Sequence, residues 1–477
     1  MPEQFLSDDR RVITRLFLPG EKKRILSILH RVLALSDAEV EKLLQGVMTR
    51  FANRHRDIEK AFEHHFREVA VYLDHPDKVS RERRLLLGSY FTMEYSIEAA
   101  ALFNPSIVPH PDQSGVPAGA IRFIMSLRAT GEGHVSSITF RTGIIAANGK
   151  IAVHRVGRYV QPAREVKERR YHKHTYFLKL IEMAAYNDIA GDVLDRLGEQ
   201  FVFDDLLRAI DEVNDPKYDA DLYQQTGNDM RWLARSNYHL SFPEECDVSE
   251  VVIFPVTENE SRGIEDARFV RFVDDDGEVT YYGTYTAYNG FRILPQLIET
   301  PDFKHYQINT LNGQFAQNKG VALFPRKIDG WYMMLSRVDG ENLYLMPSSN
   351  LRFWNDAEQM QSPMFPWEFV QIGNCGSPLE TEEGWLLLTH GVGPMREYCI
   401  GAMLLDLEDP SRVIAQTREP LLAPNDKERE GYVPNVVYSC GAMIHHGILV
   451  IPYAMSDSAT SIATVPVRDL LDHMLRG

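Results

Sequence analysis

The stretch Glu265-Asp266-Ala267-Arg268-Phe269 leads through Asp276-Gly277 into Thr280-Tyr281-Tyr282-Gly283-Thr284-Tyr285. Alternating side chains on both sides of a glycine-containing turn predict a β-hairpin. The same pattern of strand, turn and strand recurs with turns around 110–120, Asp329-Gly330, Glu383-Gly384 and His446-Gly447. The last four hairpins follow at intervals of about 55 residues, near the range of propeller blades. We therefore predict a mainly β fold, a five-bladed β-propeller. A β-sandwich is the alternative, although it requires no repeating turn period.

Helical periodicity occupies the two parts of the chain outside these hairpins. Ser36 and Glu39 fit a capping box ahead of an apolar stripe, and residues 1–100 are predicted to form an N-terminal helical extension. Residues 101–477 are predicted to form the propeller, interrupted by a helical insertion at about 166–235. Either helical part fits an oligomer interface, a wall of the substrate cleft, or a jacket that stabilises the propeller.

The composition limits the classes of function. The net charge of −16 over 477 residues argues against nucleic acid or an anionic membrane as a partner. The four cysteines form no CxxC pair, and the first residues carry no signal-peptide pattern. We expect a soluble cytoplasmic protein without a disulfide framework. If it binds an anion, its positive charge must be gathered locally.

Antiparallel hairpins bring the start of one strand and the end of the next to the same end of a sheet. That end, called the mouth below, is predicted to collect acids, cations and amides from every hairpin. Its predicted residues are Asn104, Glu265, Asp266, Asn318, Lys319, Asn374, Arg128, Tyr285, Arg337, His390 and Asp457. Because a strand has a period of two, Glu265 and Asp266 are expected to face opposite sides.

The mouth residues fit the cleavage of glycosidic bonds. A carboxylic acid protonates the leaving oxygen, and either a second carboxylate activates water or an anion such as phosphate attacks directly. A phosphate dianion requires cations, and Lys319, Arg337 and His390 come from different hairpins. Aromatic candidates for sugar contact are Tyr285, Tyr288, Trp331 and Trp385. No metal site is expected, because the pairs His64-His65, His172-x-His174 and His445-His446 are all interpreted as surface residues.

The chain resembles glycoside hydrolase family 130, the β-mannoside phosphorylases and their hydrolytic relatives, over about 101–165 and 236–465. The motifs that carry the resemblance are Ser126-Leu127-Arg128-Ala129-Thr130-Gly131-Glu132, Gly263-Ile264-Glu265-Asp266-Ala267-Arg268, Tyr285-Thr286-Ala287-Tyr288, Asn318-Lys319-Gly320-Val321, Gly384-Trp385-Leu386-Leu387-Leu388-Thr389-His390-Gly391, Leu404-Leu405-Asp406-Leu407-Glu408-Asp409-Pro410 and Pro434-Asn435-Val436-Val437-Tyr438-Ser439-Cys440-Gly441. Together these motifs are specific, whereas any one of them is weak.

The resemblance implies roles for individual residues. Asp266 resembles the general acid of the family, which acts through a sugar hydroxyl, and Lys319, Arg337 and His390 resemble residues of a phosphate site. The implied substrate-binding residues are Arg128, Glu265, Arg268, Tyr285, Tyr288, Asn289, Asn318 and Asp457. Arg292 has no secure counterpart in the family pattern.

The resemblance also implies a reaction. Because the basic residues of the phosphate site are present, we expect phosphorolysis of β-mannooligosaccharides, with inversion, to α-D-mannose 1-phosphate. Inorganic phosphate is then a co-substrate, and no cofactor is needed. A homo-oligomer is a possible assembly state. A hydrolase that uses Asp266 with Asp457 or Glu265, and a propeller that binds sugar without turnover, are the alternatives.

Overall fold

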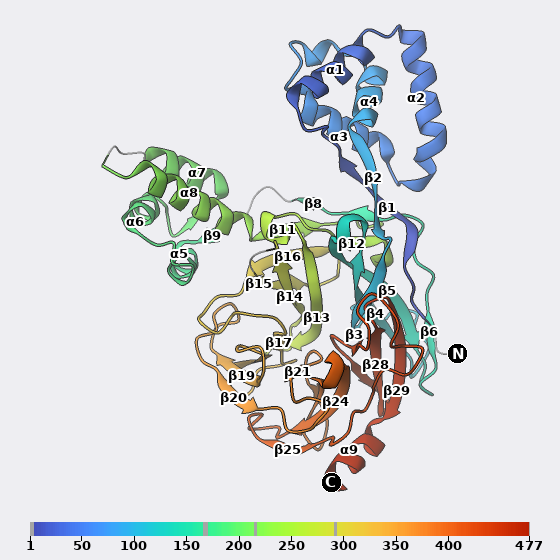
Figure 1. Cartoon of the computed structure of the whole chain (residues 1–477), viewed down its shortest axis with the longest axis vertical. Coiled ribbons are helices and arrows are strands. Elements are labelled where there is room, and N and C mark those ends of the chain that lie inside the picture. The colour runs from blue at the N-terminus through green and yellow to red at the C-terminus, as the bar shows by residue number, and fades with distance from the viewer. Residues whose placement is uncertain (1–3, 166–169, 214–216, 291–292, 477) are drawn as a thin grey trace.

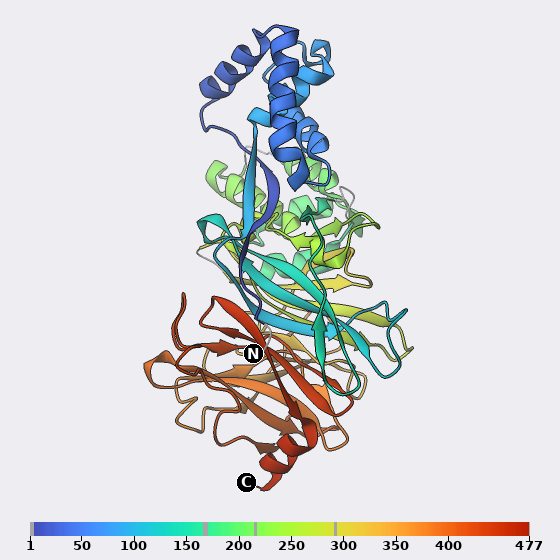
Figure 2. The same cartoon turned by 90° about the vertical axis from the view of Figure 1, so that its right-hand side faces the viewer.

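The structure, a computed structural model, describes residues 4–165, 170–213, 217–290 and 293–476. A helical unit lies at one end of the long axis, and a body of β-strands fills the other end (Figure 1). The view at right angles shows the same separation, with β1 and β2 running from the strands to the helices (Figure 2).

The N-terminal unit contains helices and one pair of strands. Its elements are β1 (Asp8–Leu16), α1 (Lys22–Leu33), α2 (Asp37–Phe51), α3 (Ile58–Ala70), α4 (Arg81–Tyr90) and β2 (Thr92–Glu98). The capping box is present: Ser36 and Glu39 bond reciprocally at the start of α2. The prediction of helix throughout 1–100 is wrong for β1 and β2, which pair antiparallel. The apolar run after Leu85 leaves the helix at Tyr90, and in β2 Tyr95 and Ile97 then alternate as strand residues that are buried.

A buried ionic cluster joins this unit to the strands. Glu98 accepts from Arg11 at 2.8 Å and from Arg141 at 2.7 Å. Arg11 also donates to the carbonyl oxygen of Ser249 at 2.7 Å. Because a carboxylate with no exposed surface is held here between two guanidinium groups, removing any one charge would leave the others uncompensated.

The described strands within residues 101–153 and 263–466 fall into five successive groups, numbered in chain order. They are β3 (Ala101–Pro109), β4 (Ile121–Thr130), β5 (Ser136–Ile145) and β6 (Ile151–Val153); β13 (Gly263–Val273), β14 (Val279–Tyr288), β15 (Ile293–Thr300) and β16 (His305–Thr310); β17 (Ala322–Leu323), β18 (Tyr332–Ser336), β19 (Leu343–Ser348) and β20 (Glu358–Gln361); β21 (Gln371–Asn374), β22 (Leu379–Glu380), β23 (Trp385–Val392), β24 (Tyr398–Leu405) and β25 (Val413–Gln416); β26 (Val437–Tyr438), β27 (Met443–His445), β28 (Ile448–Met455) and β29 (Ala459–Pro466). The predicted hairpin turns all connect antiparallel strands within these groups.

Each strand group packs against the next through its own set of buried apolar side chains. Phe140 and Phe269 join the first and second groups, and Phe272 and Met334 join the second and third. The later contacts follow the same order: Phe324 with Trp385, Leu388 with Ile451, and Val450 with Met125. The packing order therefore returns from the fifth group to the first. The first two groups also share a sheet, because Gly263 pairs with Ser136.

The helical insertion has an apolar core of its own. Its helices are α5 (Lys173–Glu182), α6 (Asp188–Asp195), α7 (Phe203–Glu212) and α8 (Ala220–Arg235). The flanking short strands are β7 (Gln161–Pro162), β8 (Arg164–Glu165), β9 (Tyr171–His172), β10 (Gln200–Phe201), β11 (Tyr238–Ser241) and β12 (Val251–Ile253). Lys179 donates to the carbonyl oxygen of Leu311 at 3.0 Å, and Glu182 accepts from the amide of Gly313 at 2.6 Å. These contacts fix α5 against the second strand group.

The last helix of the described residues, α9 (Val467–Arg476), packs on the fourth and fifth groups. Among the helices in the described ranges, none combines the length and the apolar character that a membrane span requires.

Candidate active site

Asp266 lies in a β-bulge at the start of β13. Its φ of +57° is left-handed, and the register against β14 shifts between Glu265 and Arg268. The bulge turns both carboxylates toward Arg128, which bonds Glu265 at 2.8 Å and Asp266 at 3.4 Å. The prediction that these carboxylates face opposite sides is therefore wrong, since a bulge cancels the period of two.

The same left-handed backbone conformation recurs at other positions of the mouth. Asn104, Asn318 and Asp457 also have a left-handed φ, of +48°, +67° and +51°. Asn and Asp tolerate this conformation better than other residues with a side chain. The repeated Asn or Asp at these positions thus has a backbone cause.

Asp266 and Glu265 are held by donors from several strand groups. The Asn104 amide donates to Asp266 at 2.6 Å, and Lys319 donates to Glu265 at 2.6 Å. Burial opposes ionisation of Asp266, but the charges of Arg128 and Arg268 and the Asn104 hydrogen bond outweigh it and lower its pKa. Asp266 is therefore a carboxylate in the unliganded protein.

Arg337 and His390 form a second part of the cluster. The buried His390 donates from Nδ1 to the carbonyl oxygen of Asn374 at 3.0 Å, and its Nε2 accepts from Arg337 at 3.3 Å. These roles follow because a carbonyl oxygen only accepts and a guanidinium only donates. Burial first, and then the charges of Arg337 and Arg268, hold the pKa of His390 well below its usual value. His390 is thus a neutral imidazole that orients Arg337.

Several guanidinium groups of the cluster keep donors that the protein does not satisfy. In the described part of the chain, the buried Nε atoms of Arg128, Arg268 and Arg337 have no hydrogen-bond partner. An unmade hydrogen bond of a buried donor costs about 1–3 kcal/mol. Arg128, Arg268 and Lys319 also act on Asp266 by their charge, and Arg337 lies against His390, so the cluster gathers the positive charge that an anionic ligand requires.

Some residues of the cluster were not assigned roles from the sequence. The Tyr438 hydroxyl accepts from Arg268 at 2.7 Å, and its ring centre lies 4.9 Å from that of His390. Phe103 lies beneath Arg128, 5.0 Å from the guanidinium carbon to the ring centre. Tyr438 stands within a motif of the family resemblance, so the signal was present. Phe103 precedes Asn104 and carried no signal beyond that.

Tyr285, Trp331 and Trp385 lie outside the cluster, whereas Tyr288 lies beside Lys319 of the cluster. Tyr285 is only 2% exposed, and its hydroxyl donates to Glu260 inside the core at 2.5 Å. Trp385 is also buried, and Trp331 is exposed at a turn. Tyr288 is half-buried with Lys319 5.8 Å above its ring, and Asn289 follows it. Arg292 lies outside the described residues.

The histidine pairs differ in their surroundings. His172 and His174 are exposed, whereas His65 is buried and bonds Thr92 at 2.7 Å, so its prediction as a surface residue is wrong. In the described ranges, no group of His, Cys, Asp and Glu is arranged to hold a metal ion.

Asp457 lies at the edge of the carboxylate cluster. Burial, followed by the charge of Asp266, raises its pKa to about 6 from an ordinary value of 3.8, while Arg128 and Arg396 act in the opposite direction. Since the raised pKa makes the ionised form unfavourable in the folded protein, the contribution of Asp457 to the free energy of unfolding should fall as pH rises from about 4 to about 6.

The variant Asp457→Asn should remove this pH dependence. Relative to the parent it should be stabilised by about 3 kcal/mol above pH 7 and hardly at all near pH 4. Urea unfolding at the two pH values measures the difference. A change in stability of equal size at both pH values would show that the charge of Asp457 does not cause the change.

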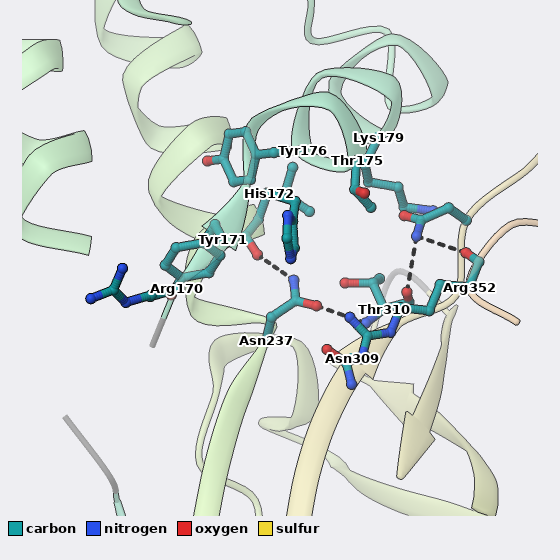
Figure 3. A pocket seen from close by; sticks show the side chains of 12 residues that line it. Arg170, Tyr171, His172, Thr175, Tyr176, Lys179, Asn237, Asn309, Thr310 and Arg352 are labelled. Atoms are coloured by element: carbon teal, nitrogen blue, oxygen red, sulfur yellow. Dashed lines mark hydrogen bonds between the residues drawn. The ribbon is translucent and has the colours of Figure 1, made fainter. Parts of the chain in front are cut away.

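A separate small cavity lies between α5 and the strands β11 and β16 (Figure 3). It has a volume of about 60 Å³, and Arg170, Lys179, Asn237 and Arg352 are among its lining residues. Two of its cations already have partners: Lys179 bonds Glu182, and Arg352 bonds Glu299. None of its lining residues belongs to the carboxylate cluster, so the cavity is distinct from the candidate site.

The fold and the cluster together define a mainly β protein with a buried site of carboxylates and cations. Residues 239–476 match a family model described as beta-1,4-mannooligosaccharide phosphorylase. A 1,2-β-oligomannan phosphorylase from a Thermoanaerobacter species is 36% identical over 222 residues, which cover 45% of this chain and 72% of that protein. The chain belongs to glycoside hydrolase family 130.

Two further proteins extend the comparison. A β-1,2-mannobiose phosphorylase from Listeria innocua is 33% identical over 46% of this chain and 63% of its own length. A β-1,4-mannooligosaccharide phosphorylase from Ruminococcus albus is 31% identical over 43% and 63%. The solved structure of the Listeria innocua β-1,2-mannobiose phosphorylase with β-1,2-mannobiose aligns with a TM-score of 0.46 and 20% identity, over 80% of this chain and 94% of that one.

Proposed function

We propose that this protein is an inverting phosphorylase that cleaves β-mannosidic bonds with inorganic phosphate and releases α-D-mannose 1-phosphate. The observation that carries the proposal is the gathering of cations at the carboxylates: Arg128 bonds Glu265 and Asp266, Lys319 bonds Glu265, and Arg337 bonds the neighbouring His390. Related proteins named as β-1,2- and β-1,4-mannoside phosphorylases support it.

We propose that the five strand groups are the blades of a five-bladed β-propeller and that residues 101–477 form the catalytic domain. The packing order that returns from the fifth group to the first supports this arrangement. The site residues then come from the strand ends of every blade.

In the proposed reaction, Lys319 and Arg337 hold the phosphate dianion, and His390 keeps Arg337 in position. Phosphate attacks the anomeric carbon while Asp266 supplies a proton to the leaving oxygen through a sugar hydroxyl. Asp266 is ionised without ligands, but the negative charge of phosphate offsets the nearby cations and raises its pKa toward protonation. The reaction needs no cofactor, because phosphate is the nucleophile.

Hydrolysis on the same site is the second candidate, and Asp457 is the observation that favours it. Asp457 is a further carboxyl group close enough to Asp266 for their charges to interact. If it faces the sugar from the opposite side, it can serve as a base for water.

The deciding experiment incubates the protein with β-1,2- and β-1,4-mannobiose, with and without phosphate. Mannose 1-phosphate formed only with phosphate supports phosphorolysis. Free mannose formed at equal rates in both tubes supports hydrolysis, and the absence of products leaves a sugar-binding protein. The preferred substrate of the panel defines the linkage.

A further inference from the structure

Two exposed rings from distant parts of the chain stack beside the mouth. Tyr432 is 69% exposed, and its ring centre lies 5.5 Å from that of His134, with 22° between the ring planes. His134 follows the end of β4, the strand that carries Arg128. A stacked aromatic pair contributes only about 0.5–1.5 kcal/mol. This stacking energy is small, and most of the Tyr432 side chain stays exposed to solvent. The exposed part of its ring is therefore available for a ligand.

Backbone contacts place Tyr432 next to the catalytic cluster. The amide of Val433 donates to the carbonyl oxygen of Ser456 at 3.1 Å. Gly431 packs so closely on Ser456 that an added Cβ would lie 2.4 Å from that same carbonyl oxygen. The loop carrying Tyr432 is therefore fixed against the turn that contains Asp457, which in turn interacts electrostatically with Asp266.

The two sides of the mouth differ in chemistry. Lys319, Arg337 and His390 lie on the third and fourth strand groups, whereas His134 follows the first and Tyr432 precedes the fifth. In a displacement with inversion, the leaving sugar lies opposite the attacking phosphate. In the proposed site the leaving sugar is therefore expected away from the phosphate residues of the third and fourth groups, and the stacked rings lie beside the first and fifth.

We propose that Tyr432, supported by His134, is the platform that binds the leaving sugar of the substrate. One face of a pyranose ring presents C–H groups, which pack well on the electron-rich face of an aromatic ring. Tyr432 supplies that face, and Arg396, after β23, lies near enough to Asp457 to add a polar edge. This inference rests on the proposed function, because it assigns the part of the substrate that departs.

The test uses the synthetic direction, with mannose 1-phosphate as donor and mannose as acceptor. Tyr432→Ala should raise the KM for the acceptor about tenfold, with the KM for mannose 1-phosphate within about twofold of the parent. Tyr432→Phe should behave like the parent, since the ring is kept. His134→Ala should also raise the KM for the acceptor, but by less than Tyr432→Ala does.

Trp331→Ala is the matched control, because Trp331 is a 48% exposed aromatic residue at a hairpin turn outside the cluster, and it should change neither constant. Unchanged constants for Tyr432→Ala, or an equal rise of both, would overturn the platform. If the parent turns over no β-mannoside, the proposed function fails. Calorimetric binding of β-linked disaccharides then tests the platform: weaker binding to Tyr432→Ala supports it, and equal or absent binding rejects it.

Discussion

The variant Asp266→Asn should lose about a thousandfold in kcat, the effect expected when a general acid is removed. Asparagine has nearly the same size and keeps an oxygen that accepts from the Asn104 amide and Arg128. It also tolerates the left-handed φ of +57° at this position, so the bulge should persist. The loss should therefore come from the missing proton rather than from a changed backbone. Initial rates of phosphate-dependent release of mannose 1-phosphate from β-mannobiose measure this loss in kcat.

A matched control lies in the turn of the same hairpin. Asp276 accepts from the amide of Glu278 at 2.9 Å and is exposed, so Asp276→Asn should leave kcat unchanged. Calorimetry should show that Asp266→Asn still binds the disaccharide, since its loss lies in the chemical step. If Asp266→Asn retained a tenth or more of the parent rate, Asp266 would not be the proton donor.

The hairpins were predictable because their signals are local. Gly277, Gly330 and Gly447 have a left-handed φ at the predicted turns, which glycine adopts at little cost. The capping box at Ser36 is equally local, since both of its partners lie within one helical turn. Such features depend on few residues, so the order of the chain is enough to find them.

The gathering of cations was also predictable, because antiparallel pairing fixes which strand ends share an edge. The direction of each side chain was not. The period-two rule failed at Asp266, where the bulge depends on how β13 pairs with β14. The rule also did not distinguish Tyr285 from the residues of the mouth. Tyr285 lies on β14 and points into the core, where its hydroxyl bonds Glu260. The strand β1 was missed because its partner β2 lies more than 70 residues away in the sequence.

Lys319→Ala should raise the apparent KM for phosphate by about 10- to 100-fold, the loss expected for one charged hydrogen bond. The KM for the oligosaccharide should stay within about threefold, because Lys319 is proposed to contact the phosphate and not the sugar. Its bond to Glu265 at 2.6 Å is lost as well, but Arg128 still holds that carboxylate at 2.8 Å. Phosphate titrations at saturating sugar, and sugar titrations at saturating phosphate, separate the two constants.

Arg337→Ala should act in the same way, and Arg337→Lys should recover part of the phosphate affinity, since lysine keeps the charge but not the planar fork. Lys327→Ala is the matched control: Lys327 bonds Asp274 at 2.6 Å outside the cluster, and removing it changes the net charge equally. If only general electrostatic attraction drew phosphate in, Lys327→Ala would raise its KM as much as Lys319→Ala does. A rise of both KM values in Lys319→Ala would instead place this lysine against the sugar, and the nucleophile would then be held by other groups.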